Sequence, residues 1–344
     1  MLDGGQLRKL IDDDGISGVT SNPTIFANAI TKSTDYDGVI AQLSADGADT
    51  EAIYTELVKR DIQDACDALL PLWAKSDKKD GHVSVEVSPE LAHNTDGTIA
   101  DARAWWQRVD RQNLLIKVPS TLAGLPAIEQ LISEGISVNV TLIFSLERYR
   151  AVAEAYLRGI ERLIENGGDP AGVASVASFF VSRFDSEVDT RLDEVGTNAA
   201  LALRGKTAVA NAQAAYGTFL EIFAGDRWDR LSGAGAQLQR PLWASTSTKN
   251  PDYNDLLYVE PLIVGHTVNT MPLSTIDAYR DHGNYYPRPF GTEEIAAALV
   301  ALADLTSAGV DYDDVVQVLE DEGVDKFVVS YKELLASISE QAAR

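Results

Sequence analysis

Short apolar runs alternate with longer amphipathic stretches along the whole chain, and this alternation limits the fold more strongly than any other feature of the sequence. Within the runs, apolar residues follow one another without polar alternation, which is typical of parallel strands buried on both faces. The stretches between them carry apolar residues at helical spacing, as at Leu125, Ile128 and Leu131. The pattern therefore predicts repeated strand–helix units. Strands are predicted at residues 16–21, 82–87, 113–118, 137–143, 173–178, 240–245 and 266–270.

Seven strand–helix units in one chain favour a (β/α)8 barrel, an α/β fold, over a doubly wound sheet, which is the alternative. The prediction is a single domain over residues 1–344 with a helical tail from about residue 290. The count is one strand short, and the shortage falls at the beginning, because residues 6–12 already read as a helix. We therefore expect the first strand to be missing from this sequence. Helices are predicted at 125–134, 145–166, 207–223, 292–308, 312–320 and 325–344.

Composition excludes several classes of partner. The chain has 52 acidic and 29 basic residues, a net charge of −23, which repels nucleic acids and anionic membranes. The longest apolar runs, such as residues 173–181, are far shorter than the ~20 residues of a membrane helix. We expect no nucleic acid and no membrane as partner, while self-association into a homo-oligomer stays open.

Cysteine and histidine usage argues against disulfides and metal sites. The chain has one cysteine, Cys66, which fits a reducing, cytoplasmic location. Its four histidines are scattered without metal-ligand spacing. No Walker loop is present, and no Gly-x-Gly-x-x-Gly motif joins a strand to a helix, so no nucleotide cofactor is expected.

Polar residues stand at the end of every predicted strand, where an α/β barrel carries its chemistry. Lys117 ends a buried strand, where desolvation favours the neutral amine that attacks ketones to form a Schiff base. The alternative for Lys117 is a solvated residue on the rim. Glu86 serves either proton transfer or a structural salt bridge to Lys117. The strand-end residues are Asn22, Glu86, Lys117, Asn139 with Thr141, Ser178, Ser245 and Asn269.

Further polar residues lie just beyond the strands. Asn22 precedes a proline and suits a turn whose side chain bonds its own backbone, and Thr121 suits a helix cap. Arg183 follows the fifth predicted strand, and the run from Ser245 to Lys249 follows the sixth. Hydroxyls beside cations suit a phosphomonoester, and a polar loop is the alternative.

Six segments together carry a resemblance to transaldolases, in the same order as in that family. The resemblance covers nearly the whole chain and keeps the order of the segments, so it is specific. The segments are residues 18–26 (GVTSNPTIF), 116–121 (IKVPST), 135–145 (GISVNVTLIFS), 176–183 (VASFFVSR), 243–249 (WASTSTK) and 268–272 (VNTMP).

The resemblance implies a TIM barrel that moves a dihydroxyacetone unit from sedoheptulose 7-phosphate to glyceraldehyde 3-phosphate without metal or cofactor. The products are erythrose 4-phosphate and fructose 6-phosphate. By motif, Lys117 is the Schiff-base lysine, Glu86 transfers protons through a water, and Thr121 stands near that water. The other carried-over positions are Asn22, Asn139, Thr141 and Ser178 on the dihydroxyacetone unit, Arg183 and Ser245 on the phosphate, and Ser247 or Lys249 in place of a second phosphate arginine.

The sequence departs from the family at its start. The family places a catalytic aspartate at the end of strand one, whereas Asp3 lies 19 residues before Asn22 with only two residues preceding it. We expect either a start upstream of Met1 or an incomplete barrel. Two alternative functions follow: a fructose 6-phosphate aldolase, and a non-catalytic sugar-phosphate-binding barrel.

Overall fold

The computed structural model describes residues 5–285 and 291–343. The chain divides into two compact units. The first contains residues 5–139, 172–174 and 324–343 of the described chain, and the second contains residues 140–171, 175–285 and 291–323. Each unit is described by itself.

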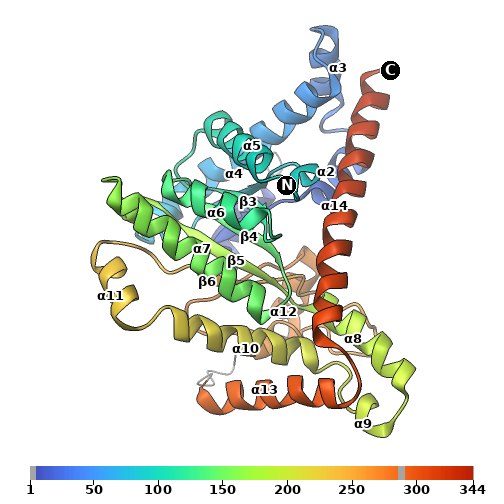
Figure 1. The fold of residues 1–344 in the computed structure, drawn as a ribbon. Coiled ribbons are helices and arrows are strands. Elements are labelled where there is room, and N and C mark those ends of the chain that lie inside the picture. The colour runs from blue at the N-terminus through green and yellow to red at the C-terminus, as the bar shows by residue number, and fades with distance from the viewer. Residues whose placement is uncertain (1–4, 286–290, 344) are drawn as a thin grey trace. The chain divides into compact units, whose positions relative to one another are not determined.

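Both units are built on parallel strands whose neighbours in space are also neighbours in sequence (Figure 1). The described residues contain seven strands, as predicted. In neither unit do the strands show the reversal of strand order that a doubly wound sheet requires. The predicted α/β, TIM-barrel-like fold with additional C-terminal helices is confirmed. The strands are β1 (Gly18–Thr20), β2 (His82–Glu86) and β3 (Leu114–Pro119) in the first unit, β5 (Ser175–Phe180), β6 (Arg240–Ala244) and β7 (Val268–Asn269) in the second, and β4 (Val138–Ile143), which the unit boundary divides.

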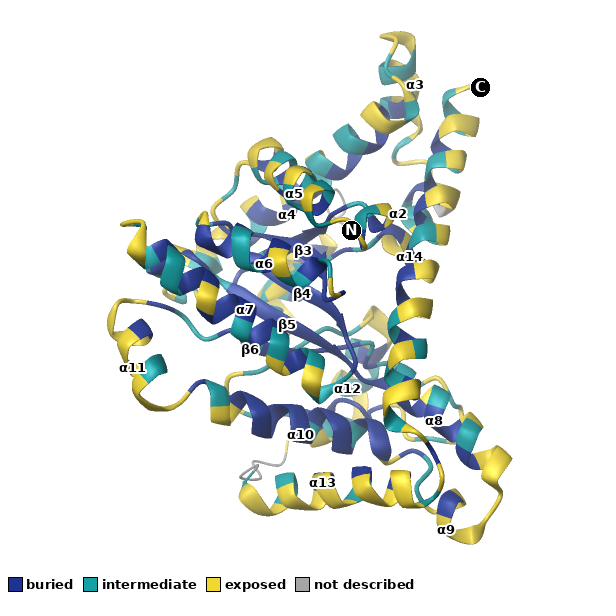
Figure 2. Ribbon diagram, in the orientation of Figure 1, coloured by how far each residue is buried: buried dark blue, intermediate teal, exposed yellow. Residues whose placement is uncertain are grey.

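Helices separate the strands of the first unit, and capping side chains fix where several of them begin. Asn94 accepts a hydrogen bond from the Gly97 amide at the start of α5, and Asp49 accepts one from Ala52 at the start of α4. Strands β2 and β3 are almost fully buried (Figure 2), whereas the residues of β1 are exposed or half-buried. The helices are α1 (Gln6–Asp14), α2 (Pro23–Lys32), α3 (Asp37–Ala45), α4 (Thr50–Lys75), α5 (Thr95–Val109) and α6 (Gly124–Ser133), with a short 3-10 helix at Pro89–Leu91.

The second unit contains α7 to α13 and two further short 3-10 segments. Its helices α10 and α13 pack through small residues, with Ala210 and Ala214 against Ala298 and Leu302. The helices are α7 (Leu146–Glu165), α8 (Ser182–Val195), α9 (Asn198–Leu201), α10 (Thr207–Ile222), α11 (Gly225–Gly233), α12 (Leu273–His282) and α13 (Thr292–Ser307), and the 3-10 segments are Pro170–Gly172, whose last residue belongs to the first unit, and Glu260–Leu262.

The tail contains one long helix where two were predicted. Helix α14 runs without interruption over Tyr312–Ala342, so the predicted separation into 312–320 and 325–344 is wrong; Arg344 lies outside the described residues. The predicted break contains Gly323, which lies inside the helix. A Cβ at Gly323 would come within 3.0 Å of the Leu142 side chain. The glycine therefore allows close packing of the helix on β4 instead of ending it.

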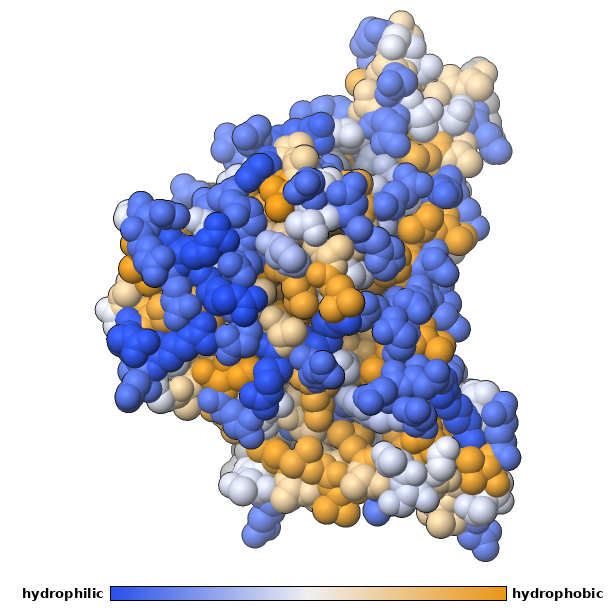
Figure 3. Space-filling model, in the orientation of Figure 1, coloured by the Kyte–Doolittle hydropathy of each residue, from blue (hydrophilic) through white to orange (hydrophobic). Residues whose placement is uncertain are grey.

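Apolar side chains remain on the surface of α13, where Figure 3 shows an apolar patch and where Leu299 and Val300 are 50% and 59% exposed. Within the described residues, no single helix is long and apolar enough to cross a membrane. Helices α13 and α14 reach the length and apolar composition of a membrane span only when taken together, and they form a pair bent by 95°.

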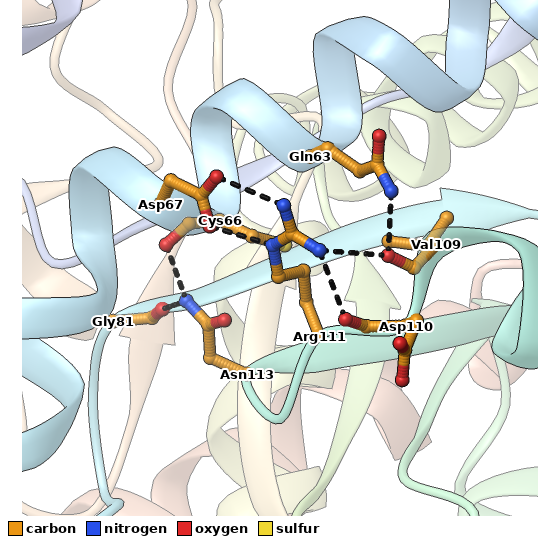
Figure 4. Close-up of polar contacts among 8 residues, drawn as sticks. All are labelled: Gln63, Cys66, Asp67, Gly81, Val109, Asp110, Arg111 and Asn113. Carbon is orange, nitrogen blue, oxygen red and sulfur yellow. Dashed lines mark hydrogen bonds and ion pairs between the residues drawn. The ribbon is translucent and has the colours of Figure 1, made fainter.

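A polar network holds the first unit together where β2 and β3 begin (Figure 4). The buried amide of Asn113 donates to the backbone carbonyls of Cys66 and Gly81, at 2.9 and 2.8 Å. Gly81 has φ +85°, and a Cβ there would lie 2.5 Å from the backbone nitrogen of Trp73, so this turn requires glycine. The network thereby joins the middle of α4 to the residues that precede β2 and β3.

An ion pair lies beside this network. Arg111 binds the carboxylate of Asp67 through two nitrogens, at 2.6 and 3.0 Å, and lowers its pKa (Figure 4). The two side chains are 31% and 51% exposed, so water screens the pair.

We predict that Asn113→Ala lowers the free energy of unfolding by about 2–4 kcal/mol, because two buried carbonyls lose their donor and a small cavity is left. Asp67→Asn, the matched change at the exposed ion pair, should cost at most ~1 kcal/mol. Urea unfolding of both variants measures the difference. Equal decreases in the free energy of unfolding of the two variants would show that the buried amide of Asn113 stabilises the fold no more than the exposed ion pair does.

Buried carboxylates organise the second unit. Asp185 in α8 accepts hydrogen bonds from the Thr207 hydroxyl, the Ala208 amide and the Tyr258 hydroxyl, at 2.8, 2.7 and 3.0 Å. Burial raises its pKa to about 6 although these donors oppose the shift. One turn later, Asp189 accepts from the hydroxyl of Tyr253 at 2.6 Å. The two carboxylates tie α8 to α10 and to the segment after β6.

The pKa of Asp185 predicts a pH-dependent stability. A carboxyl whose pKa is raised on folding holds its proton more tightly in the folded state, so its contribution to stability falls as pH rises from about 4 to about 6. For this shift the fall is on the order of 3 kcal/mol. Asp185→Asn keeps the shape and removes the ionisation, so the stability difference between the natural protein and the variant should change by that amount between pH 4 and pH 7.

The measurement is chemical unfolding at several pH values, with Asp193→Asn as control because Asp193 is 50% exposed on the same helix. The control should change stability by less than ~0.5 kcal/mol. A constant difference between the natural protein and Asp185→Asn across this range would contradict the assignment.

Candidate active site

Lys117 and Glu86 lie side by side on β3 and β2; Glu86 ends β2, whereas Lys117 lies two residues before the end of β3, so the prediction that it ends its strand is wrong by two residues. The parallel register places the two residues side by side, and their charged atoms lie 3.5 Å apart. Both are buried, at 6% and 7% exposure, so Lys117 is not a solvated rim residue. Burial raises the pKa of Glu86, and the positive charge of Lys117 opposes that rise. The salt bridge predicted as one role of Glu86 is therefore present, and proton transfer stays a prediction.

A second polar group lies deeper in the first unit. The amide of Asn139 donates to the hydroxyl of Ser84 at 3.0 Å, and the Ser21 hydroxyl donates to the Ser84 carbonyl at 2.8 Å. Ser84 lies two residues before Glu86 in β2, so the two side chains share one face of the strand. Sequence reasoning missed Ser84 and Ser21, although a serine inside an otherwise apolar strand was an available signal.

Asn22 and Thr121 both stabilise local backbone. The Asn22 side chain accepts from the Ile25 amide at 2.8 Å and begins α2, so the predicted side-chain–backbone turn is confirmed. The Thr121 hydroxyl donates to the Ala92 carbonyl and accepts from the Gly124 amide, which begins α6. The predicted capping role of Thr121 is therefore confirmed.

In the second unit, Thr141 and Ser178 lie within buried strands. Strand β5 continues to Phe180, so the prediction that Ser178 ends its strand is wrong by two residues; the apolar run extends beyond the serine. The Thr141 hydroxyl is fully buried and has no hydrogen-bond partner among the described residues. Beside it, Leu142 has φ +61°, a strained value for a bulky residue. Strain beside an unpaired polar atom is a mark of functional sites.

Ser245 and Arg183 form a second feature of this unit. Ser245 also has a positive φ, 55°, and its hydroxyl lies 3.0 Å from that of Ser182 at the start of α8. The Arg183 guanidinium lies over the Phe180 ring, 5.4 Å from its centroid. Burial lowers the pKa of Arg183, and the charge of Glu322 on α14 opposes that change.

Lys249 lies within electrostatic range of Arg183. Its pKa is lowered by partial desolvation and by the positive charge of Arg183. Its ammonium donates to the Ser247 hydroxyl at 2.6 Å. Two cations near each other and beside the first turn of α8 suit an anion, which would relieve their repulsion. The described residues contain no group of three or more His, Cys, Asp or Glu side chains arranged to hold a metal ion.

Comparisons with known proteins identify the family. Residues 1–338 match the family described as transaldolase/fructose-6-phosphate aldolase. The chain belongs to this family. It is 51% identical to a transaldolase of Mycolicibacterium smegmatis over 335 residues, 97% of this chain and 90% of that protein. It is 52% identical to a transaldolase of Mycobacterium tuberculosis over 336 residues, again 97% and 90%, and 51% identical to one of Thermobifida fusca over 342 residues, 99% and 93%. These matches confirm the predicted resemblance and support transaldolase function, a transferase activity.

The unpaired hydroxyl of Thr141 allows a test that separates stability from function. Thr141→Val removes a buried unsatisfied hydroxyl, so we expect the free energy of unfolding to rise by about 1 kcal/mol. If substrate normally satisfies this hydroxyl, kcat/KM for transaldolase turnover should fall about three- to tenfold. Thr141→Ser keeps the hydroxyl and should keep kcat/KM within about threefold. Unchanged kcat/KM in Thr141→Val would exclude a substrate contact.

Proposed function

We propose that this chain is a transaldolase of the pentose phosphate pathway that works through a Schiff base on Lys117. It transfers dihydroxyacetone from sedoheptulose 7-phosphate to glyceraldehyde 3-phosphate, giving erythrose 4-phosphate and fructose 6-phosphate. The observation that carries this proposal is the buried Lys117 near the end of β3, with the Glu86 carboxylate 3.5 Å from its nitrogen. The family match and the transaldolases at 51–52% identity support it.

Lys117 supplies the nucleophile. Its neutral amine attacks the C2 ketone of the donor, and the resulting carbinolamine loses water to give an iminium. The iminium accepts the electron pair of the C3–C4 bond when that bond breaks and the C4 hydroxyl loses its proton. An aldehyde then departs, and an enamine stays on Lys117. The enamine carbon attacks the acceptor aldehyde, and hydrolysis of the new iminium releases the ketose.

Glu86 transfers protons during formation and hydrolysis of the Schiff base. Loss of water from the carbinolamine requires a proton on the departing hydroxyl, and hydrolysis requires its return. A buried carboxyl with a raised pKa holds such a proton closer to neutral pH than an exposed one. In this proposal a water carries the proton between Glu86 and the substrate, and Thr121 lies near that water.

The polar side chains of the strands hold the substrate. The amides of Asn22 and Asn139 bind hydroxyls of the dihydroxyacetone group, and the hydroxyls of Thr141 and Ser178 bind the same group. The unpaired Thr141 hydroxyl supports this assignment.

Arg183, Ser245 and Lys249 bind the phosphate. The electrostatic coupling of Lys249 to Arg183 supports Lys249 as the second cation, in preference to Ser247 alone. The proton of the C4 hydroxyl needs a base, for which the family uses an aspartate. Asp3, the position considered for it, lies outside the described residues.

The proposal also includes the location of the protein, its domain organisation and its oligomeric state. The single cysteine supports a cytoplasmic location. A single barrel domain over residues 1–344 is also expected, while self-association into a homo-oligomer stays open.

The test is trapping with sodium borohydride in the presence of fructose 6-phosphate, followed by intact-mass and peptide mass spectrometry. Borohydride reduces the iminium to a stable amine, so the natural protein should carry a dihydroxyacetone-sized adduct on Lys117. Lys117→Met should form no adduct and lose at least about a thousandfold in kcat, because no other nucleophile replaces the amine. Glu86→Gln should still form the adduct, with kcat lowered by a factor of about 10²–10⁴.

Product analysis with and without acceptor separates the alternatives. A transaldolase turns over only when an acceptor aldehyde is present. Steady release of dihydroxyacetone without acceptor would indicate a fructose 6-phosphate aldolase, which the same family includes. Binding of sugar phosphate to folded protein with no adduct would indicate a non-catalytic sugar-phosphate-binding protein and overturn the proposal.

A further inference from the structure

The C-terminal half of α14 packs over the strand ends of the first unit. Ser330 of this helix accepts a hydrogen bond from Thr24, shortly after β1, at 2.8 Å. Lys332 pairs with Glu90, shortly after β2, at 3.4 Å. These contacts place residues 324–342 along the edge of the sheet where Lys117 and Glu86 lie.

Phe327 of this helix contacts the reactive nitrogen itself. The Lys117 Nζ lies over the Phe327 ring, 5.5 Å from its centroid, within the range of a cation–π contact. Phe327 is only 4% exposed. The nitrogen therefore lies close to both the ring of Phe327 and the carboxylate of Glu86.

Contacts farther along the helix fix Phe327 in place. One turn later, the Tyr331 hydroxyl donates to the Glu51 carboxylate at 2.9 Å, and its ring packs edge-on against Tyr54 with centroids 5.4 Å apart. Leu334 and Ile338, on the same side of the helix, are completely buried. This part of α14 is a docked element of the first unit, and the position of the Phe327 ring follows from that docking.

We propose that Phe327 is a catalytic residue that covers the Schiff-base nitrogen, stabilises its positive charge and excludes bulk solvent from it. The inference rests on the proposed function, because it assigns a role at the nitrogen of Lys117. An aromatic face attracts a cation, so the ring favours the iminium that forms there. A hydrocarbon surface at the same atom also leaves little room for solvent.

Exclusion of water decides the fate of the enamine. Protonation of the enamine carbon gives the iminium of dihydroxyacetone; water then adds to the iminium carbon, and dihydroxyacetone leaves with the Lys117 amine free again. Attack on an acceptor aldehyde instead forms a carbon–carbon bond and completes the transfer. A ring that blocks solvent therefore favours transfer over release.

The experiment compares the natural protein with Phe327→Leu, which keeps an apolar side chain and removes the aromatic face. Borohydride trapping measures adduct formation on Lys117, and product analysis measures the ratio of free dihydroxyacetone to transferred dihydroxyacetone. In Phe327→Leu we expect the trapping rate to fall about tenfold and the ratio to rise about tenfold. A merely structural role would not change the ratio. Val329→Ala, at a 55% exposed position of the same helix, is the matched control and should change neither quantity.

The outcomes separate this inference from the proposed function. No adduct in the natural protein overturns both. An adduct in the natural protein, with Phe327→Leu giving the same trapping rate and product ratio as Val329→Ala, overturns the role of Phe327 alone. If Phe327→Leu does not fold, Phe327→Met replaces it in both measurements, because methionine fills the site with a more flexible side chain.

Discussion

The buried pair of Lys117 and Glu86 is the interaction on which the candidate site of the first unit depends. Removing two charges from water costs several kcal/mol for each, and only close pairing and further polar contacts offset that cost. The register of β2 and β3 provides the pairing, since it places the two residues side by side. The Phe327 ring also lies close to this nitrogen, with its centroid 5.5 Å away. A lysine held in this way is protected from solvent and adjacent to a carboxylate, and the proposed Schiff-base chemistry uses both features.

In the second unit, backbone strain and an unpaired hydroxyl near the polar strand residues lower the stability of the folded state. Leu142 and Ser245 both have positive φ, and the Thr141 hydroxyl is buried without a partner among the described residues. Each of these features lowers stability by about 1–3 kcal/mol. The hydrogen bonds to Asp185 and the close packing at Gly323 stabilise the surrounding elements. The unit therefore keeps locally unfavourable residues at positions that the proposed function assigns to substrate, within an otherwise well-packed frame.

Sequence periodicity predicted the strands well because a buried parallel strand leaves a continuous apolar run. Lys117 and Glu86 stood out because a charged residue in such a run needs a reason to be there. The same reasoning failed for Ser178, whose strand continues through two phenylalanines, and for α14, which was predicted to end at residue 320 although it continues through Gly323, where the missing side chain permits close packing. It also missed Phe327, since nothing local distinguishes this aromatic residue from an ordinary core residue. Its contact with Lys117 exists only after the distant C-terminal helix has docked.

That docking links the tail to the chemistry. Tyr331, Leu334 and Ile338 bury apolar area against the first unit, and this burial holds the helix that carries Phe327. Helix ends fray more readily than helix centres, and α14 ends near Ala342, where the Ser44 hydroxyl donates to the last described turns of the helix. Phe327 lies well before this end, so fraying of the final turn would leave the ring on Lys117. Loss of the contacts at Tyr331 would instead expose the nitrogen to water. In the proposed mechanism, the ring that covers the Schiff base is therefore held in place by residues that do not contact the substrate.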